Sequence, residues 1–162
     1  MCSSDLTAAW LAHHGRQAAL WSPSGAGTQA LRSTSGRGVL RYAGAISGEV
    51  QIDILGDVRE VSAHPVVLIA LPGHACPAVL PRLMPYLDGR HLVVVSGALS
   101  LVPLWLHEQS GAPGNRPLVA SWGTSLATAR SSPDCGVIVN SVRTRFDMAA
   151  IPGAAAGRAH DA

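Results

Sequence analysis

Apolar positions occur along this chain in continuous runs as well as in short runs bounded by Gly, Ser and Pro. Residues 66–71 (VVLIAL) and 92–95 (LVVV) are continuous apolar runs. Strands covered on both faces, as in parallel sheets, have this pattern. Shorter apolar runs between turn residues predict further strands. The full set of expected strands is 17–21, 38–42, 50–54, 66–71, 92–95, 118–121 and 136–142.

Helix-like stretches separate these runs, at residues 7–14, 25–32, 58–63, 77–87 and 99–109. Because Pro81 lies inside the fourth stretch, we expect a short or bent helix there. Alternation of strands and helices predicts an α/β domain, and the right-handed crossover rule makes its mainly parallel sheet doubly wound. The Ala/Gly-rich tail, residues 153–162, is expected to be weakly ordered.

Composition narrows the class of protein. The 162 residues suit one domain, and with 48% hydrophobic and 14% charged residues they can bury both faces of a sheet. All 12 basic residues are Arg, which excludes lysine chemistry. The net charge of +2 and the few aromatic residues argue against a nucleic-acid surface.

The cysteines and the hydropathy bear on the compartment. The three cysteines are widely spaced, and His74 with Cys76 matches no usual metal-ligand spacing. No apolar stretch has the length of a membrane span, and the N-terminus lacks signal-peptide features. We therefore expect a cytoplasmic protein with reduced thiols and no membrane partner.

Small and turn residues follow several expected strands. Ser22 and Ser24 follow the first, Pro72 and Gly73 the fourth, and Ser96 with its neighbour Gly97 the fifth. Each turn alone is an ordinary strand–helix connection. Ligands of doubly wound sheets, however, bind beyond the carboxyl ends of the strands, where small residues let a flat ligand approach the backbone. Three such turns on one edge predict a cofactor cleft.

The residues after Trp21 bear on the choice of cofactor. In NAD-specific folds an acidic residue at this position binds the ribose hydroxyls, and none stands here. The hydroxyls of Ser22, Ser24 and Thr28 could instead donate to a 2′-phosphate, and Arg32 could bind it as a charged fork. Alternatively, Arg32 is a solvated helix residue. We expect NADP, with NAD as the alternative.

A hydrolase is a second hypothesis. Residues 123–127 (GTSLA) loosely match the G-x-S-x-G nucleophile turn, with Ser125 as the nucleophile. Asp134 and His160 could nominally complete a triad. The fifth position is Ala rather than Gly, and His160 lies in the tail expected to be weakly ordered.

Five segments together resemble the N-terminal domain of the octopine/nopaline (opine) dehydrogenases, a group related to glycerol-3-phosphate dehydrogenase and ketopantoate reductase. The resemblance covers residues 7–152. Ser96-Gly97 stands where glycerol-3-phosphate dehydrogenases have a lysine and ketopantoate reductases Gln-Asn-Gly, so the opine branch is favoured over these two alternatives. The segments are 19–21 (ALW), 66–73 (VVLIALPG), 92–99 (LVVVSGAL), 120–124 (ASWGT) and 143–152 (RTRFDMAAIP).

The resemblance implies a Rossmann domain whose first strand and glycine-rich turn are absent, with Ser3–Asp5 where that turn should end. The strands ending at Trp21 and Leu71 would then flank the place of the missing strand. A helical catalytic domain would also be absent, so we expect the chain alone to bind a dinucleotide weakly and to be inactive.

In the parent enzyme the partners implied are a dinucleotide and a small substrate: an amino acid and a 2-oxo acid would condense, and hydride transfer would reduce the imine. A homodimer is left open. No catalytic or metal-binding residue is expected. The expected cofactor-binding residues are Ser22, Ser24, Thr28, Arg32, Leu71, Pro72, Gly73, Ser96, Gly97 and Thr124.

Overall fold

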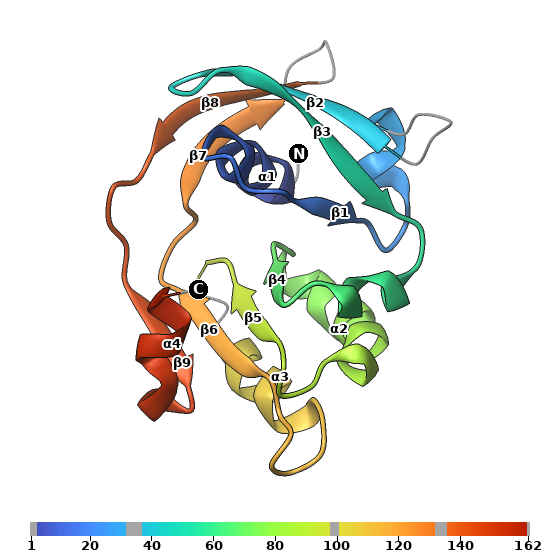
Figure 1. Ribbon diagram of the computed structural model, residues 1–162, viewed down its shortest axis with the longest axis vertical. Coiled ribbons are helices and arrows are strands. Elements are labelled where there is room, and N and C mark those ends of the chain that lie inside the picture. Colours follow the sequence, from blue (N-terminus) through green and yellow to red (C-terminus); the bar gives the residue numbers. More distant parts are fainter. Residues whose placement is uncertain (1–2, 32–36, 98–100, 132–135, 162) are drawn as a thin grey trace. The chain divides into compact units, whose positions relative to one another are not determined.

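The chain forms two compact units, each built on its own sheet (Figure 1). The computed structural model describes residues 3–31, 37–97, 101–131 and 136–161. Unit 1 comprises Met1–Asp57 and Leu126–Thr144, and unit 2 comprises Val58–Ser125 and Arg145–Ala162. Both units combine helices with sheets that contain parallel strands, which confirms the α/β class. That residues 7–152 together form one dinucleotide-binding domain stays a prediction.

Unit 1 contains a five-stranded sheet with the order β1-β3-β2-β8-β7. β1 pairs with β3 and β2 pairs with β8 in parallel, whereas β2–β3 and β7–β8 are antiparallel. Its strands are β1 (Ala19–Trp21), β2 (Arg37–Gly44), β3 (Gly48–Leu55), β7 (Ala127–Ser131) and β8 (Gly136–Val142).

Helix α1 (Ser3–His13) packs against this sheet (Figure 1). Leu6, Ala8 and Ala9 are buried on α1, and Leu40 and Tyr42 are buried on β2. Exposed residues alternate with the buried ones along β2, as expected for a strand with one face on a core. The helix expected over residues 25–32 is instead the 3₁₀ helix η1 (Ala26–Leu31).

Unit 2 contains a four-stranded sheet with the order β4-β5-β6-β9. The first three strands are parallel and in register, so that Val66, Leu92 and Leu118 lie side by side. β9 runs antiparallel to β6. The strands are β4 (Val66–Ile69), β5 (Leu92–Val95), β6 (Leu118–Trp122) and β9 (Met148–Ile151).

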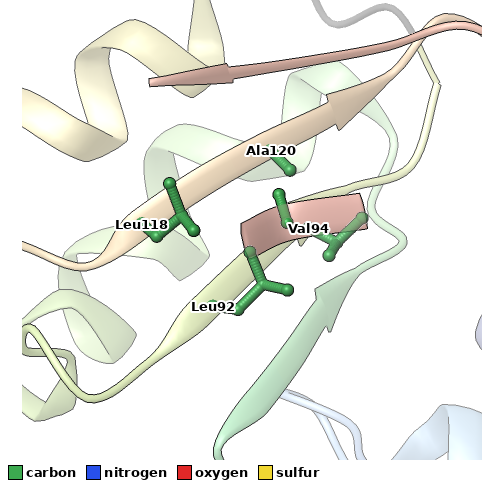
Figure 2. Packing of buried hydrophobic residues seen from close by; sticks show 5 residues of the cluster. Leu92, Val94, Leu118 and Ala120 are labelled. Carbon is green, nitrogen blue, oxygen red and sulfur yellow. The ribbon is translucent and has the colours of Figure 1, made fainter. Parts of the chain in front are cut away.

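Both faces of β5 and β6 are covered, as the continuous apolar runs predict. On one face Val93, Val95 and Val119 are fully buried. The other face carries a cluster of buried residues from β5, β6 and α4 (Figure 2). The cluster consists of Leu92, Val94, Leu118, Ala120 and Ala159.

Short helices connect these strands. α2 ends at Leu83, two residues after Pro81, and the chain continues as the 3₁₀ helix η4. α2 is therefore short, as expected from Pro81. Residues 58–63 form a 3₁₀ helix rather than an α-helix. These elements are η2 (Val58–Ala63), η3 (Gly73–Ala75), α2 (Cys76–Leu83), η4 (Met84–Tyr86) and α3 (Val102–Gln109).

The tail differs from the expected weakly ordered segment. It forms η5 (Gly153–Ala155) and α4 (Ala156–Asp161), and Ala159 is buried against the sheet. Small methyl side chains let so short a helix approach the strands closely, which composition alone does not reveal. Among the described residues, no helix combines the length and apolarity needed to span a membrane.

β1 and β4 each lie at one end of their sheet's strand order. In the described part of the chain, β1 pairs with β3 and β4 pairs with β5. That a further strand belongs between the strands ending near Trp21 and Leu71 stays a prediction.

Candidate functional site

In unit 2 the carboxyl ends of three parallel strands meet at one edge. The register places Ile69, Val95 and Ser121 in a row across β4, β5 and β6. The turns that follow therefore leave the sheet on the same side. They contain six of the expected site residues: Leu71, Pro72, Gly73, Ser96, Gly97 and Thr124.

The turn after β5 lies directly beside the end of β4. The N–H of Ser96 donates to the carbonyl oxygen of Ile69 at 2.9 Å. Gly97 then adopts φ +83°, and a Cβ built on it would meet no atom within 4 Å. The positive φ explains the glycine, and the open space leaves this backbone accessible to a ligand.

The turn after β4 is also accessible, because Pro72 and Gly73 are exposed. The Pro72 carbonyl accepts a hydrogen bond from the N–H of Ala75 at 2.9 Å, which starts η3. Leu71 is half-buried and forms the inner part of this turn. The edge therefore offers small, exposed backbone at two adjacent strand ends.

An aromatic pair stands beside the turn after β6. The rings of Trp122 and Phe146 have centroids 4.9 Å apart at an interplanar angle of 62°, a favourable edge-to-face arrangement. The N–H of Gly123 donates to the carbonyl of Asp147 at 2.9 Å, and Thr124 is half-buried. Sequence reasoning missed Phe146, because its contact depends on the pairing of β6 with β9.

In unit 1 the two serines after β1 build the turn to η1. Ser22 Oγ accepts from the N–H of Gly27 at 3.2 Å, and Ser24 Oγ accepts from the N–H of Ala26 at 3.3 Å. A hydroxyl that accepts a hydrogen bond keeps its own proton to donate. Ser22 is half-buried and Ser24 is exposed, so both could donate to an anion.

Thr28 has a different position from the one expected. It is 3% exposed, and its hydroxyl donates to the Gly25 carbonyl at 3.3 Å. The side chain therefore holds the turn together from inside. Arg32 lies outside the described residues. Ser22 and Ser24 thus belong to unit 1, and the six residues of the strand edge belong to unit 2.

The structure does not form the nucleophile turn that the hydrolase hypothesis requires. That motif needs a helix directly after the serine, whereas Ser125 is followed by strand β7. His160 is highly exposed on α4 and lies 3.2 Å from Asp161. Asp134 lies outside the described residues.

Metal and thiol chemistry find no support at this edge either. Across the described ranges, no three His, Cys, Asp or Glu side chains gather as a metal site would require. Burial raises the pKa of the Cys76 thiol, which disfavours the reactive thiolate.

A parallel sheet whose carboxyl edge carries small-residue turns is typical of doubly wound nucleotide-binding proteins. The chain is similar in structure to octopine dehydrogenase in complex with NADH and agmatine, with a TM-score of 0.70 and 14% identity over 92% of this chain and 40% of that chain. It is also similar to yersinopine dehydrogenase with NADP⁺ bound, with a TM-score of 0.61 and 15% identity over 91% and 38% of the two chains.

A third similar structure is a putative ketopantoate reductase from Ralstonia solanacearum MolK2, with a TM-score of 0.56 and 17% identity over 96% of this chain and 54% of that chain. No protein-family model matches the chain, and no curated protein matches it. The chain spans 32% to 40% of the length of the octopine and yersinopine dehydrogenases. These likenesses show a Rossmann-like fold and confirm, at the level of fold, the resemblance to opine dehydrogenases.

Proposed function

We propose that this chain provides the dinucleotide-binding fold of an NAD(P)-dependent dehydrogenase of the opine type. The observation that carries the proposal is the edge of unit 2, where β4 and β5 end in register and the open backbone of Gly97 follows. The similar octopine and yersinopine dehydrogenases were solved with NADH and NADP⁺. A nicotinamide dinucleotide bound here would supply the hydride of the reaction.

Unit 1, taken by itself, also offers groups that fit part of such a cofactor. Ser22 and Ser24 keep hydroxyl protons for a phosphate or ribose oxygen. Residues 22–31 contain no carboxylate that would repel a 2′-phosphate, which favours NADP over NAD.

The first turn of α1 fits a cofactor pyrophosphate poorly. It carries Asp5, whose Oδ1 accepts a hydrogen bond from Ser4 Oγ at 3.3 Å. A carboxylate at a helix N-terminus occupies the positive end of the dipole and repels phosphate. We therefore expect this 162-residue chain to bind the dinucleotide weakly and to turn over no substrate.

The reaction class proposed for the whole enzyme is reductive condensation of an amino acid with a 2-oxo acid. Support for it comes from the fold likeness to octopine and yersinopine dehydrogenases, of which this chain spans less than half. The arginine and agmatine of the octopine dehydrogenase structures suggest a cationic amino acid as the first substrate to try.

Isothermal titration calorimetry of the purified chain with NADPH tests the proposal. We expect a dissociation constant above about 100 μM. Asp5→Asn should tighten binding roughly fivefold, since it removes about 1 kcal/mol of repulsion at the helix N-terminus. Asp161→Asn, an exposed acid on α4, is the matched control and should leave the affinity unchanged.

Two results would contradict the proposal. If neither the wild type nor Asp5→Asn gives a saturable heat at millimolar NADPH, the proposal that the chain binds a dinucleotide is wrong. Micromolar affinity of the wild type together with reduction of an imine by the chain alone would overturn the weak-binding, inactive assignment.

A further inference from the structure

An open cavity lies at the opposite edge of the unit 2 sheet, where β4, β5 and β6 begin. Its volume is about 180 Å³, well above the roughly 10–15 Å³ that one water molecule needs. The dinucleotide proposal makes no use of this edge. The lining residues are Pro65, Val66, Arg90, His91, Leu92, Leu118 and Arg158.

The floor of this cavity is apolar. Val66, Leu92 and Leu118 are register partners on adjacent parallel strands, so their side chains point to the same face of the sheet. Leu92 and Leu118 belong to the cluster seen in Figure 2, whereas Val66 is 46% exposed. The backbone N–H groups here have hydrogen-bond partners. The N–H of Leu92 donates to the carbonyl oxygen of Pro65, and the N–H of Leu118 donates to the carbonyl oxygen of His91.

The packing of α4 determines where Arg158 stands. The next residue, Ala159, is buried against Leu92 and Leu118 on the same face of the sheet. Arg158 is exposed and lines the cavity. No acidic side chain in the described part of the chain forms an ion pair with Arg158. Its guanidinium is therefore a cation beside an apolar floor, with no ion-pair partner among the described residues.

Arg90 supplies a second guanidinium, already partly engaged. Its Nε lies 3.1 Å from both carboxylate oxygens of Asp88, and its Nη2 lies 3.0 Å from Oδ2. Asp88 itself is not among the lining residues, but its carboxylate lies 3.0 Å from Arg90 Nη2 and 3.0 Å from His91 Nδ1. It therefore offsets the charge of Arg90 and leaves Arg158 as the main cation of the cavity.

His91 forms part of the cavity wall. It is 3% exposed; its Nδ1 accepts from the N–H of Asp88 at 3.0 Å, and its Nε2 lies 3.2 Å from the Ser62 carbonyl. Both ring nitrogens therefore have partners in unit 2, and the imidazole keeps the 88–91 turn in place.

We propose that this cavity binds a small organic carboxylate with a short apolar chain. A guanidinium matches a carboxylate in planar, bidentate geometry, and the row formed by Val66, Leu92 and Leu118 would cover the hydrocarbon part. Arg158 is the primary anchor, because Arg90 shares its charge with Asp88. The site binds independently of any dinucleotide.

Butyrate is the probe for this site, titrated into the full 162-residue chain at low ionic strength and followed by NMR chemical shifts. We expect saturable shifts with a dissociation constant of about 1–10 mM, confined to residues around the cavity. Butyramide, which lacks the charge, should not bind. Inorganic phosphate, which lacks the apolar chain, should bind more weakly than butyrate.

Arg158→Met separates anion binding from a purely structural role of the side chain. It keeps an unbranched apolar stem over the sheet and removes the charge, so folding should persist while butyrate affinity falls about tenfold or more. Arg145→Met, an exposed arginine of the same unit outside the cavity, should leave the affinity unchanged. Arg90→Met should cause a smaller loss and provides a second variant if Arg158→Met does not fold.

Three results would overturn the proposal. They are the absence of saturable butyrate shifts, equal binding of butyramide or phosphate, and an equal loss of affinity in Arg158→Met and Arg145→Met.

Discussion

Gly44 and Gly97 both have positive φ angles, of +109° and +83°, but their surroundings differ. A Cβ on Gly97 would meet no atom within 4 Å, whereas a Cβ on Gly44 would overlap the carbonyl oxygen of Val139 and lie 3.1 Å from its carbon. Gly44 and Val139 are register partners of β2 and β8. We therefore expect Gly44→Ala to destabilise the protein far more than Gly97→Ala.

The magnitude follows from three contributions. Both alanines carry a left-handed backbone penalty of about 1–2 kcal/mol. At Gly44 the Val139 carbonyl must also move, which disrupts its 2.8 Å hydrogen bond from the N–H of Ala45, at a cost of about 1 kcal/mol. Displacing Val139, which is 1% exposed, adds about 1–2 kcal/mol of overpacking. The totals are about 3–5 kcal/mol for Gly44→Ala and about 1–2 kcal/mol for Gly97→Ala.

Equilibrium urea unfolding, followed by tryptophan fluorescence and circular dichroism, measures both free energies. The expected difference of about 2–3 kcal/mol corresponds to a difference in melting temperature of roughly 4–12 °C for a chain of this size. Equal losses in the two variants would refute the reasoning, because they would show that the β2–β8 contact at Val139 does not constrain position 44.

Two further predictions concern titratable groups of unit 2. The hydrogen bonds from Arg90 lower the pKa of Asp88 from 3.8 to about 2, so its stabilising contribution is present above about pH 4 and is lost as pH falls toward 2. Asp88→Asn should remove this part of the acid dependence of unfolding, whereas Asp161→Asn should retain it. Burial raises the pKa of the Cys76 thiol, so Cys76 should react with Ellman's reagent only after unfolding. A Cys76→Ser control, which has one thiol fewer, would identify the signal, and rapid labelling of native Cys76 would contradict this prediction.

The strands with strong apolar patterns were predictable from sequence. The runs at Leu92–Val95 and Gly136–Val142 are strands with the expected bounds, because their β-branched residues pack well on a pleated, buried surface. The sequence ATARS of β7 and the sequence MAAI of β9 carry no such signal. They form strands because β8 and β6 offer them hydrogen-bonding partners, and such long-range pairing leaves no local pattern.

The candidate site was predictable only where local sequence patterns determine it. Small residues after apolar runs indicate turns, and the parallel register places the turns at Gly73 and Gly97 on one edge. The direction of a side chain is not encoded in such a pattern. Thr28 faces inward toward the Gly25 carbonyl. Its place in a Ser- and Gly-rich turn predicts an exposed hydroxyl instead.

The interleaving of the two units along the chain has a consequence for the order in which the protein is made. Each unit is assembled from an early and a late segment: residues 1–57 with 126–144, and 58–125 with 145–162. During synthesis, β2 therefore cannot pair with β8, and β6 cannot pair with β9, until the later strand of each pair has been made. Multidomain chains commonly fold one domain at a time from the N-terminus. A chain with this topology cannot do so, because neither unit is a continuous segment. Each sheet acquires its last strand only after a segment of the other unit has been synthesised, so the nascent chain carries unpaired strand edges during that interval.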